Sequence, residues 1–174
     1  MEILGQRIDR LSHAGRDRFR AEHVGVIFQM FNLLPYGQVI DNVILPLSFA
    51  PGRRRRVEAA GGAVSEARRL LLSLGLDEAK HNALASSLSI GQQQRVAVAR
   101  ALIGAPELIV ADEPTSALDL RNQEKFLELL FAQVEAAGAS LIMVSHDERM
   151  AERFDRVVNL SELAVDHAAG RLLE

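Results

Sequence analysis

The sequence has 174 residues, of which 48% are hydrophobic and 25% charged, so it is long enough to bury the core of one ordinary domain. Its net charge of -3 and its pI near 6.0 disfavour phosphate-backbone binding, which needs a basic surface. Cysteine does not occur, which excludes disulfides, thiol catalysis and zinc-thiolate sites and fits a reducing cytosol. We also expect neither a signal peptide nor a transmembrane span, since no apolar run approaches roughly 18 residues.

The first half of the chain predicts one strand and one clear helix. A short β-branched apolar run predicts a strand over 23–28, and a turn-rich loop follows it. The run Arg53 to Arg56 is predicted to form an exposed turn or helix start; a solvated face is favoured over a docking or acidic-lipid patch. Leucines at helical spacing predict a helix over 63–76 that stops at Gly75.

A helix from Ser89 to roughly Ile103 is predicted next, and its start carries a phosphate-binding pattern. Ser89 and Gln92 have the spacing of a capping box, in which the two side chains satisfy each other's backbone amides. Gly91 allows close approach to the backbone, so the free amides and the positive end of the helix could receive an anionic phosphate. Taken alone, this pattern fits an ordinary capped helix better.

A buried strand over 108–113 is predicted to end in two carboxylates, immediately before Pro114. Ligands of an open parallel sheet bind beyond the carboxyl ends of its strands, so a metal ligand and a base belong at this position. Asp112 would hold Mg²⁺, usually through water, and Glu113 would polarise an attacking water. A solvated acidic turn is the alternative for an isolated pair.

A second apolar strand, residues 140–144, precedes His146, which could contact a γ-phosphate or the attacking water. A histidine considered alone is more often structural or merely exposed. The helix between the two strands has an apolar stripe that we assign to the core rather than to a cofactor site: Phe126, Leu127, Leu130, Phe131 and Val134.

In chain order, Gln29 after a strand, LSIGQQQR, LIVADEP, SALD and VSHD resemble the ATPase subunits of ABC transporters over nearly the whole chain. The runs IFQMFNLLP and DNVILPL are similar to the branch that serves lipoprotein release and macrolide export. The resemblance implies an α/β fold: a P-loop NTPase-type (RecA-like) core with a parallel sheet and an inserted helical subdomain. It also implies a division into a partial core, 1–35 and 91–174, and a helical subdomain, 36–90, that ends at the signature motif.

The resemblance assigns roles to particular residues. It implies that Glu113 is the catalytic glutamate, that Gln29 and His146 assist it, and that Asp112 and Gln29 bind Mg²⁺. It places Ser89, Gly91 and Gln92 at the γ-phosphate of ATP held by the opposite subunit, and Asp119 in the loop that couples the two sites. Ile90 stands where the family usually has glycine, and we expect this variant to be tolerated.

The implied cofactors are ATP and Mg²⁺. The implied partners are a second ATPase subunit in a head-to-tail dimer and integral membrane permease subunits, with no nucleic acid. The implied location is cytoplasmic, on the inner face of the cell membrane through the permease.

The sequence departs from the family at its start, because it contains no Gly-x-x-x-x-Gly-Lys-Ser/Thr phosphate loop. We therefore expect a truncated gene model or a fragment that lacks the first strands and is inactive alone. One alternative is a non-catalytic module that pairs with a complete subunit through Ser89, Gly91 and Asp119. A soluble ABC-type ATPase of translation or repair is another alternative. Repair members with long coiled coils have hundreds of residues between these two motifs, so the short spacing from Gln29 to Ser89 favours transport.

Overall fold

The computed structural model describes residues 1–116 and 118–160. Contacts divide the chain into one unit from Met1 to Val144 and a second unit that begins at Ser145. The predicted division into a core and a helical subdomain over 36–90 stays a prediction. The elements of the first unit are β1 (Glu2–Ile3), β2 (Gln6–Arg7), η1 (Ile8–Arg10), α1 (His13–His23), β3 (Val24–Ile27), α2 (Val39–Ile44), η2 (Leu45–Ser48), α3 (Pro51–Ala59), α4 (Ala63–Ser73), η3 (Glu78–Lys80), η4 (Ala85–Ser87), α5 (Ile90–Leu102), β4 (Leu108–Asp112), α6 (Leu120–Ala136) and β5 (Ser140–Val144). The second unit contains η5 (Glu148–Arg153).

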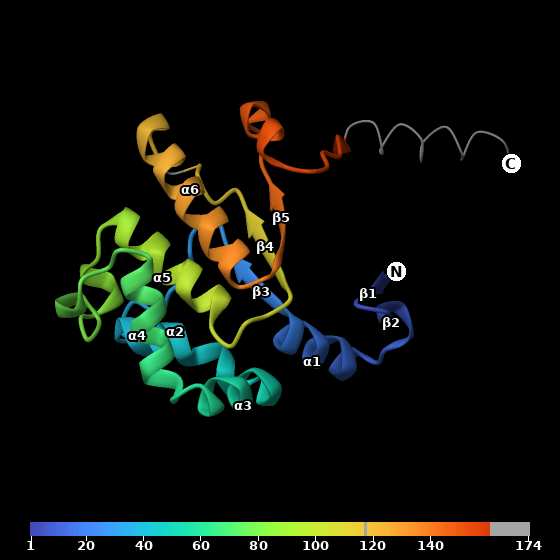
Figure 1. Cartoon of the computed structure of the whole chain (residues 1–174), viewed down its shortest axis with the longest axis horizontal. Helices are drawn as coiled ribbons and strands as arrows, with labels where there is room; N and C mark the ends of the chain where they lie inside the picture. Colours follow the sequence, from blue (N-terminus) through green and yellow to red (C-terminus); the bar gives the residue numbers. More distant parts are fainter. Residues whose placement is uncertain (117, 161–174) are drawn as a thin grey trace, which may run out of the picture. The chain divides into compact units, whose positions relative to one another are not determined.

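The strands β3, β4 and β5 lie side by side in a parallel sheet with β4 in the middle (Figure 1). The register pairs Ile27 with Ala111, and Asp112 with Val144. Because side chains alternate along a strand, one face carries Ile27, Ile109 and Ala111, which are fully buried. The core on this face includes side chains from α5 and α6. This sheet is the α/β framework that the resemblance implies.

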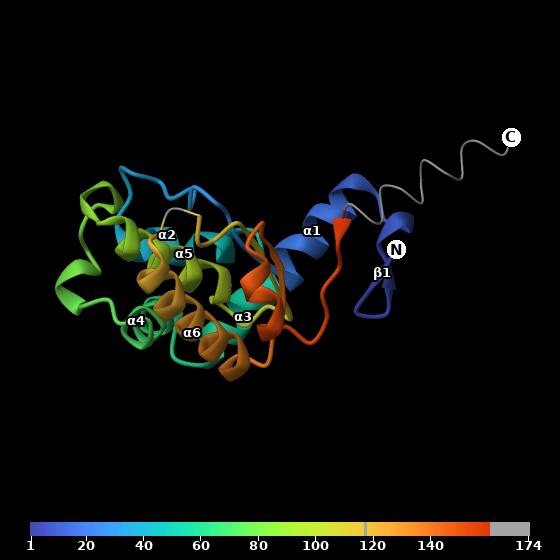
Figure 2. The ribbon, with the colours of Figure 1, turned by 90° about the horizontal axis from the view of Figure 1, so that it is seen from above.

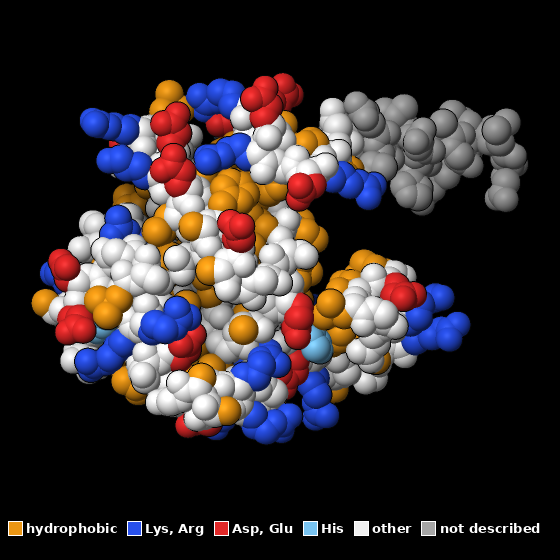
Figure 3. All heavy atoms as spheres, viewed as in Figure 1, with side chains coloured by type: hydrophobic (Ala, Val, Ile, Leu, Met, Phe, Trp, Pro, Cys, Tyr) orange, Lys and Arg blue, Asp and Glu red, His pale blue; other side chains and the backbone are white. Residues whose placement is uncertain are grey.

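The opposite face of the sheet is only partly covered within the first unit. Ile142 and Val144 on β5 are 53% and 44% exposed. Figure 3 shows hydrophobic side chains at the surface over β4 and β5. Among residues 1–116 and 118–160, no helix combines the length and the apolar character needed to cross a bilayer.

Close packing of α5 on β3 depends on Gly25. A Cβ atom at this position would lie 2.2 Å from the carbonyl oxygen of Ala101 on α5, far inside the contact distance of real Cβ atoms. Glycine therefore allows the helix that carries the signature pattern to pack directly on the first strand of the sheet. Helices α2, α4 and α5 also pack against one another, as Figure 1 and Figure 2 show.

Most predicted elements are confirmed, with small changes at their ends. Helix α4 ends two residues before Gly75, and α5 and β5 occupy the predicted ranges. The strand predicted over 23–28 is shorter, because the amide of Val24 still donates to the carbonyl of Arg20 and the amide of Phe31 closes a turn on Phe28.

The prediction of a solvated arginine face is wrong for Arg53, which is 2% exposed, and correct for the rest of the run. Helix α3 places Arg53 on the same face as Val57, one turn later, so both point into the protein. The Arg53 guanidinium donates to the carbonyls of Ala101 and Ile103 at the end of α5. Burial lowers the pKa of Arg53 to about 10, which still leaves it charged at neutral pH.

Candidate functional site

The carboxyl edge of the sheet brings together predicted site residues that are far apart in the sequence. Gln29 lies two residues beyond Ile27, and Glu113 lies two residues beyond Ala111, with which Ile27 is paired. Asp112 is the last residue of β4 and is paired with Val144 of β5. Parallel strands end at the same edge, so Gln29, Asp112 and Glu113 lie along one side of the sheet.

Glu113 occupies a constrained turn at the end of β4. Its φ of 45° lies in the left-handed region, which is uncommon for residues other than glycine. The amide of Glu113 donates to the carbonyl of Val144 at 3.0 Å, and the hydroxyl of Ser116 donates to the carbonyl of Glu113 at 3.0 Å. A continued strand would direct Asp112 and Glu113 to opposite faces, whereas this turn ends the alternation between them.

The start of α5 confirms the capping box. The amide of Ser89 donates to the side-chain oxygen of Gln92 at 3.0 Å, and the amide of Gln92 donates to the hydroxyl of Ser89 at 3.4 Å. Gly91 faces open space, since a Cβ atom built there would meet nothing within 4 Å among the described atoms beyond its chain neighbours and the backbone of its own helix turn. Internal packing therefore does not require glycine at this position, and the surface at this helix start can accept a closely bound group.

Two buried polar side chains that we did not predict link α5 to the neighbouring loops. Gln94 is 2% exposed, and its Nε2 donates to the carbonyl of Pro114, the residue after Glu113, at 2.6 Å. Arg100 is 8% exposed and donates to the carbonyls of Phe31 and Asn32 in the loop that follows Gln29. A polar residue inside the otherwise apolar run VAVARALI is the sequence signal that could have identified Arg100.

Asp119 and His146, the remaining predicted site residues, lie in two other segments of the chain. Asp119 caps α6, where its carboxylate accepts hydrogen bonds from the amide and the side chain of Asn122. Ala117, in the same predicted motif, lies outside the described residues. His146 follows the end of β5 and belongs to the unit that begins at Ser145. There, the Arg149 guanidinium beside Asp147 lowers the pKa of that carboxyl group.

The donor groups at the sheet edge suit a hard cation such as Mg²⁺. Among residues 1–116 and 118–160, no group of three or more His, Asp or Glu side chains is placed to bind a metal ion. Proteins usually hold Mg²⁺ through one or two carboxylates together with substrate phosphates and water. Asp112 and the amide of Gln29 provide oxygen ligands of the required kind.

A parallel sheet with acidic and amide groups at its carboxyl edge, next to a helix that starts with an open glycine, is the α/β arrangement that the resemblance to P-loop NTPase-type cores implies. Comparison with known families gives the particular identity. The sequence model of the ABC transporter family matches residues 1–116, and the chain belongs to this family.

Similar proteins confirm the branch that the sequence indicated. The lipoprotein-releasing system ATP-binding protein LolD of Novosphingobium aromaticivorans is 41% identical over 164 residues, which cover 93% of this chain and 69% of LolD. The macrolide export ATP-binding/permease protein MacB of Rhodopirellula baltica is 40% identical over 83% of this chain but only 20% of MacB. The chain thus spans about two thirds of its LolD relative and one fifth of MacB.

The fold is also similar to solved structures. The ATP-binding cassette MJ0796, in a dimeric post-hydrolysis structure bound to ADP and Pi, shares 35% identity and a TM-score of 0.69. The match covers 86% of this chain and 63% of MJ0796. These matches confirm the predicted fold class. The roles of individual site residues stay predictions.

Proposed function

We propose that this chain is the nucleotide-binding subunit of an ABC transporter, in which ATP binding and hydrolysis drive transport by separate membrane subunits. One observation carries the proposal. The register of β3, β4 and β5 puts Gln29, Asp112 and Glu113 at one edge of a parallel sheet, the edge at which such sheets bind their ligands. The family and the similarity to a cassette bound to ADP and Pi support the same function.

In this proposal, Glu113 is the general base that accepts a proton from the attacking water, and His146 and Gln29 orient the reacting groups. Asp112 and Gln29 would hold Mg²⁺, which would neutralise charge on the phosphate oxygens. This sequence contains no glycine-lysine phosphate loop. We therefore propose that the chain does not turn over ATP by itself.

A second subunit completes the proposed site. Ser89, Gly91 and Gln92 lie at the start of α5, where backbone amides and the helix dipole favour an anion, so this end faces the γ-phosphate of ATP on the opposite subunit. The capped loop at Asp119 couples the two sites across the same head-to-tail dimer. The openness at Gly91 supports this arrangement, because a phosphate needs space close to the backbone.

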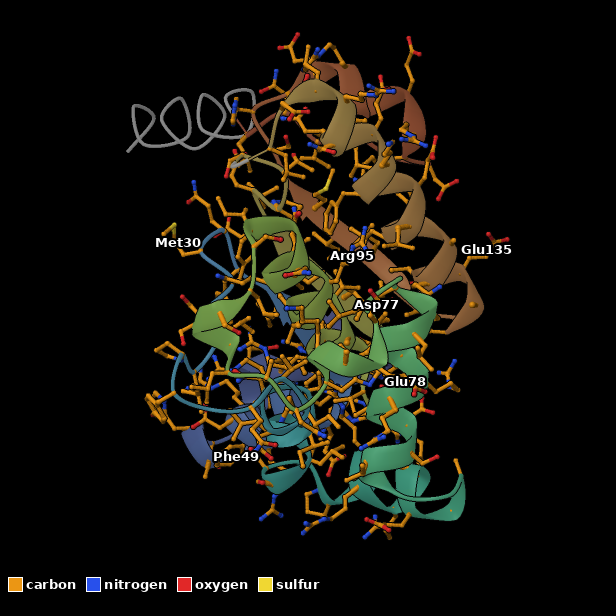
Figure 4. The ribbon with its side chains drawn as sticks, turned by 90° about the vertical axis from the view of Figure 1, so that its left-hand side faces the viewer. Met30, Phe49, Asp77, Glu78, Arg95 and Glu135 are labelled. Atoms are coloured by element: carbon orange, nitrogen blue, oxygen red, sulfur yellow. The ribbon has the colours of Figure 1, made fainter. Side chains whose placement is uncertain are left out.

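Permease subunits are the proposed membrane partners, and they would hold the chain at the cytoplasmic face of the membrane. Two large apolar side chains, which are labelled in Figure 4, support a docking surface: Met30 and Phe49 are 79% and 67% exposed. Phe49 borders an open pocket of about 630 Å³, lined by Asp17, Arg18, Ala21, Glu22, Ser48, Phe49, Pro51 and Arg55.

Replacing Glu113 with glutamine tests the catalytic proposal. In a longer form of the protein that includes a phosphate loop, assembled in its transport complex, we expect Glu113→Gln to lower ATP turnover by about 10²- to 10⁴-fold, because the amide cannot accept the proton. ATP binding should be retained, since the shape and the other contacts of the side chain are preserved. Turnover and equilibrium binding of a fluorescent ATP analogue are measured on the same preparation.

The matched control is Glu128→Gln on α6, an exposed glutamate outside the proposed site. We expect this variant to keep wild-type turnover. If Glu113→Gln hydrolyses ATP as fast as the control, Glu113 is not the general base and the proposed mechanism is wrong.

A further inference from the structure

The loop that follows Gln29 is held in an unfavourable conformation by a side chain from another element. Phe31 and Asn32 have φ values of 59° and 47°, so two consecutive residues other than glycine lie in the left-handed region. This conformation is unfavourable for L-residues with a side chain, and such a pair persists only where the surroundings determine it. Local hydrogen bonds close the loop, from the amide of Phe31 to Phe28 and from the amide of Asn32 to Met30.

Arg100, near the end of α5, provides the determining contact. Its Nη1 donates to the carbonyl of Asn32 at 2.7 Å, and its Nη2 donates to the carbonyl of Phe31. The two bonds therefore end on the two residues with left-handed backbone. Burial lowers the pKa of Arg100, because the charged guanidinium has left water. A charged donor that is 8% exposed forms stronger hydrogen bonds to carbonyls than a neutral donor would.

The same helix also contacts the segment after Glu113. Gln94 donates to the carbonyl of Pro114 at 2.6 Å, next to the left-handed turn at Glu113. Ser89 caps the start of the helix. Helix α5 runs without interruption from Ile90 to Leu102. Figure 4 labels Arg95 on this helix and Met30 in the loop that follows Gln29. One rigid element thus contacts both loops of the proposed site and carries the signature residues.

We propose that Arg100 is a positioning residue that fixes the loop of Gln29 to the signature helix, so that a displacement of the Ser89 end moves Gln29. The functional part of this inference rests on the proposed role of Gln29. Arginine is required because its planar guanidinium presents two separate N–H donors to adjacent carbonyls, whereas lysine offers a single ammonium group. Arg100→Lys should therefore restore the contact only in part.

Amide hydrogen exchange of the full chain tests the contact without any catalytic assay. In Arg100→Gln, we expect the amides of residues 30–33 to exchange about tenfold faster than in the wild type, because the loop loses a charge-assisted pair of bonds. Exchange within β4 should not change. Arg95→Gln is the matched control on the same helix, since Arg95 donates to the carbonyl of Gly75, which lies outside the loop that follows Gln29.

ATP turnover in the native complex tests the positioning role. We expect Arg100→Gln to lower kcat with little change in KM for ATP, and Arg100→Lys to give an intermediate kcat. If Arg100→Gln does not fold, exchange and turnover are read in Arg100→Lys, where wild-type values for both would overturn the inference. Unchanged exchange of the amides of residues 30–33 in Arg100→Gln would show that Arg100 does not hold this loop. Faster loop exchange with unchanged kcat would disprove the positioning role, and Glu113→Gln would still decide the proposed function separately.

Discussion

At the scale of single residues, Gly91 combines two opposing requirements. Glycine weakens a helix, and a methyl group at Gly91 would meet no described atom within 4 Å beyond its chain neighbours and the backbone of its own helix turn. The same space is where the proposed phosphate approaches the amides of α5. Stability therefore favours a larger residue at this position, whereas the proposed function favours glycine.

Gly91→Ala should separate these two effects. We expect the free energy of unfolding to stay unchanged or to rise by up to about 1 kcal/mol, because alanine restricts the unfolded chain and favours the helix. ATP turnover of the native complex should fall, because the added methyl group occupies the phosphate approach. Urea unfolding and turnover are the two measurements. Wild-type turnover in a more stable variant would remove Gly91 from the proposed site.

Local patterns were sufficient to predict some residues and not others. The capping box of Ser89 and Gln92 was predictable, because its partners lie three residues apart. The partners of Arg100 and Gln94 were not, because their acceptors are backbone carbonyls far along the chain, at Asn32 and Pro114. A buried polar side chain depends on the tertiary fold, and neither periodicity nor spacing shows its partner.

At the scale of elements, polar contacts at helix ends join α1, α3 and α5. The carboxylate of Glu22 on α1 accepts hydrogen bonds from the amides of Gly52 and Arg53, which satisfies the start of α3. Arg53 then donates to the carbonyls of Ala101 and Ile103, which satisfies the end of α5. The end of the signature helix is thus fixed by a residue of α3.

Replacing Arg53 with methionine should destabilise the protein by about 2 to 4 kcal/mol, because buried carbonyls lose a charged donor and find no replacement. Urea unfolding measures the change. Arg54→Met, at an exposed position on the same helix, should change stability by less than about 0.5 kcal/mol. An equal effect of the two substitutions would show that the contacts of Arg53 contribute nothing specific.

Periodicity explains which elements could be predicted. Helix α4 has leucines at helical spacing, the strand over 140–144 is a short apolar run, and both are found. The hairpin of β1 and β2 was not predicted, since strands of two residues have no period to detect. The order β3-β4-β5 also needed the structure, because apolar strands of similar composition can pair in several orders.

At the scale of the whole molecule, the parallel sheet determines where the chemistry lies. Its strands carry Gln29, Asp112 and Glu113 to one edge, and α5 packs on its buried face and carries the signature residues at its start. The order of the motifs along the sequence already indicated the protein family. Their common edge follows from the parallel register, which the sequence alone could not establish.

In the proposed dimer, the start of α5 receives the phosphate of ATP in a site shared by two subunits. The most direct measurement is the amide hydrogen exchange of residues 89–93 in the native complex, with and without saturating MgATP, using Glu113→Gln to prevent turnover. We predict that MgATP slows exchange at Gly91 and Gln92, because their amides then face a bound anion. Unchanged exchange at these amides in a complex saturated with ATP would contradict the claim.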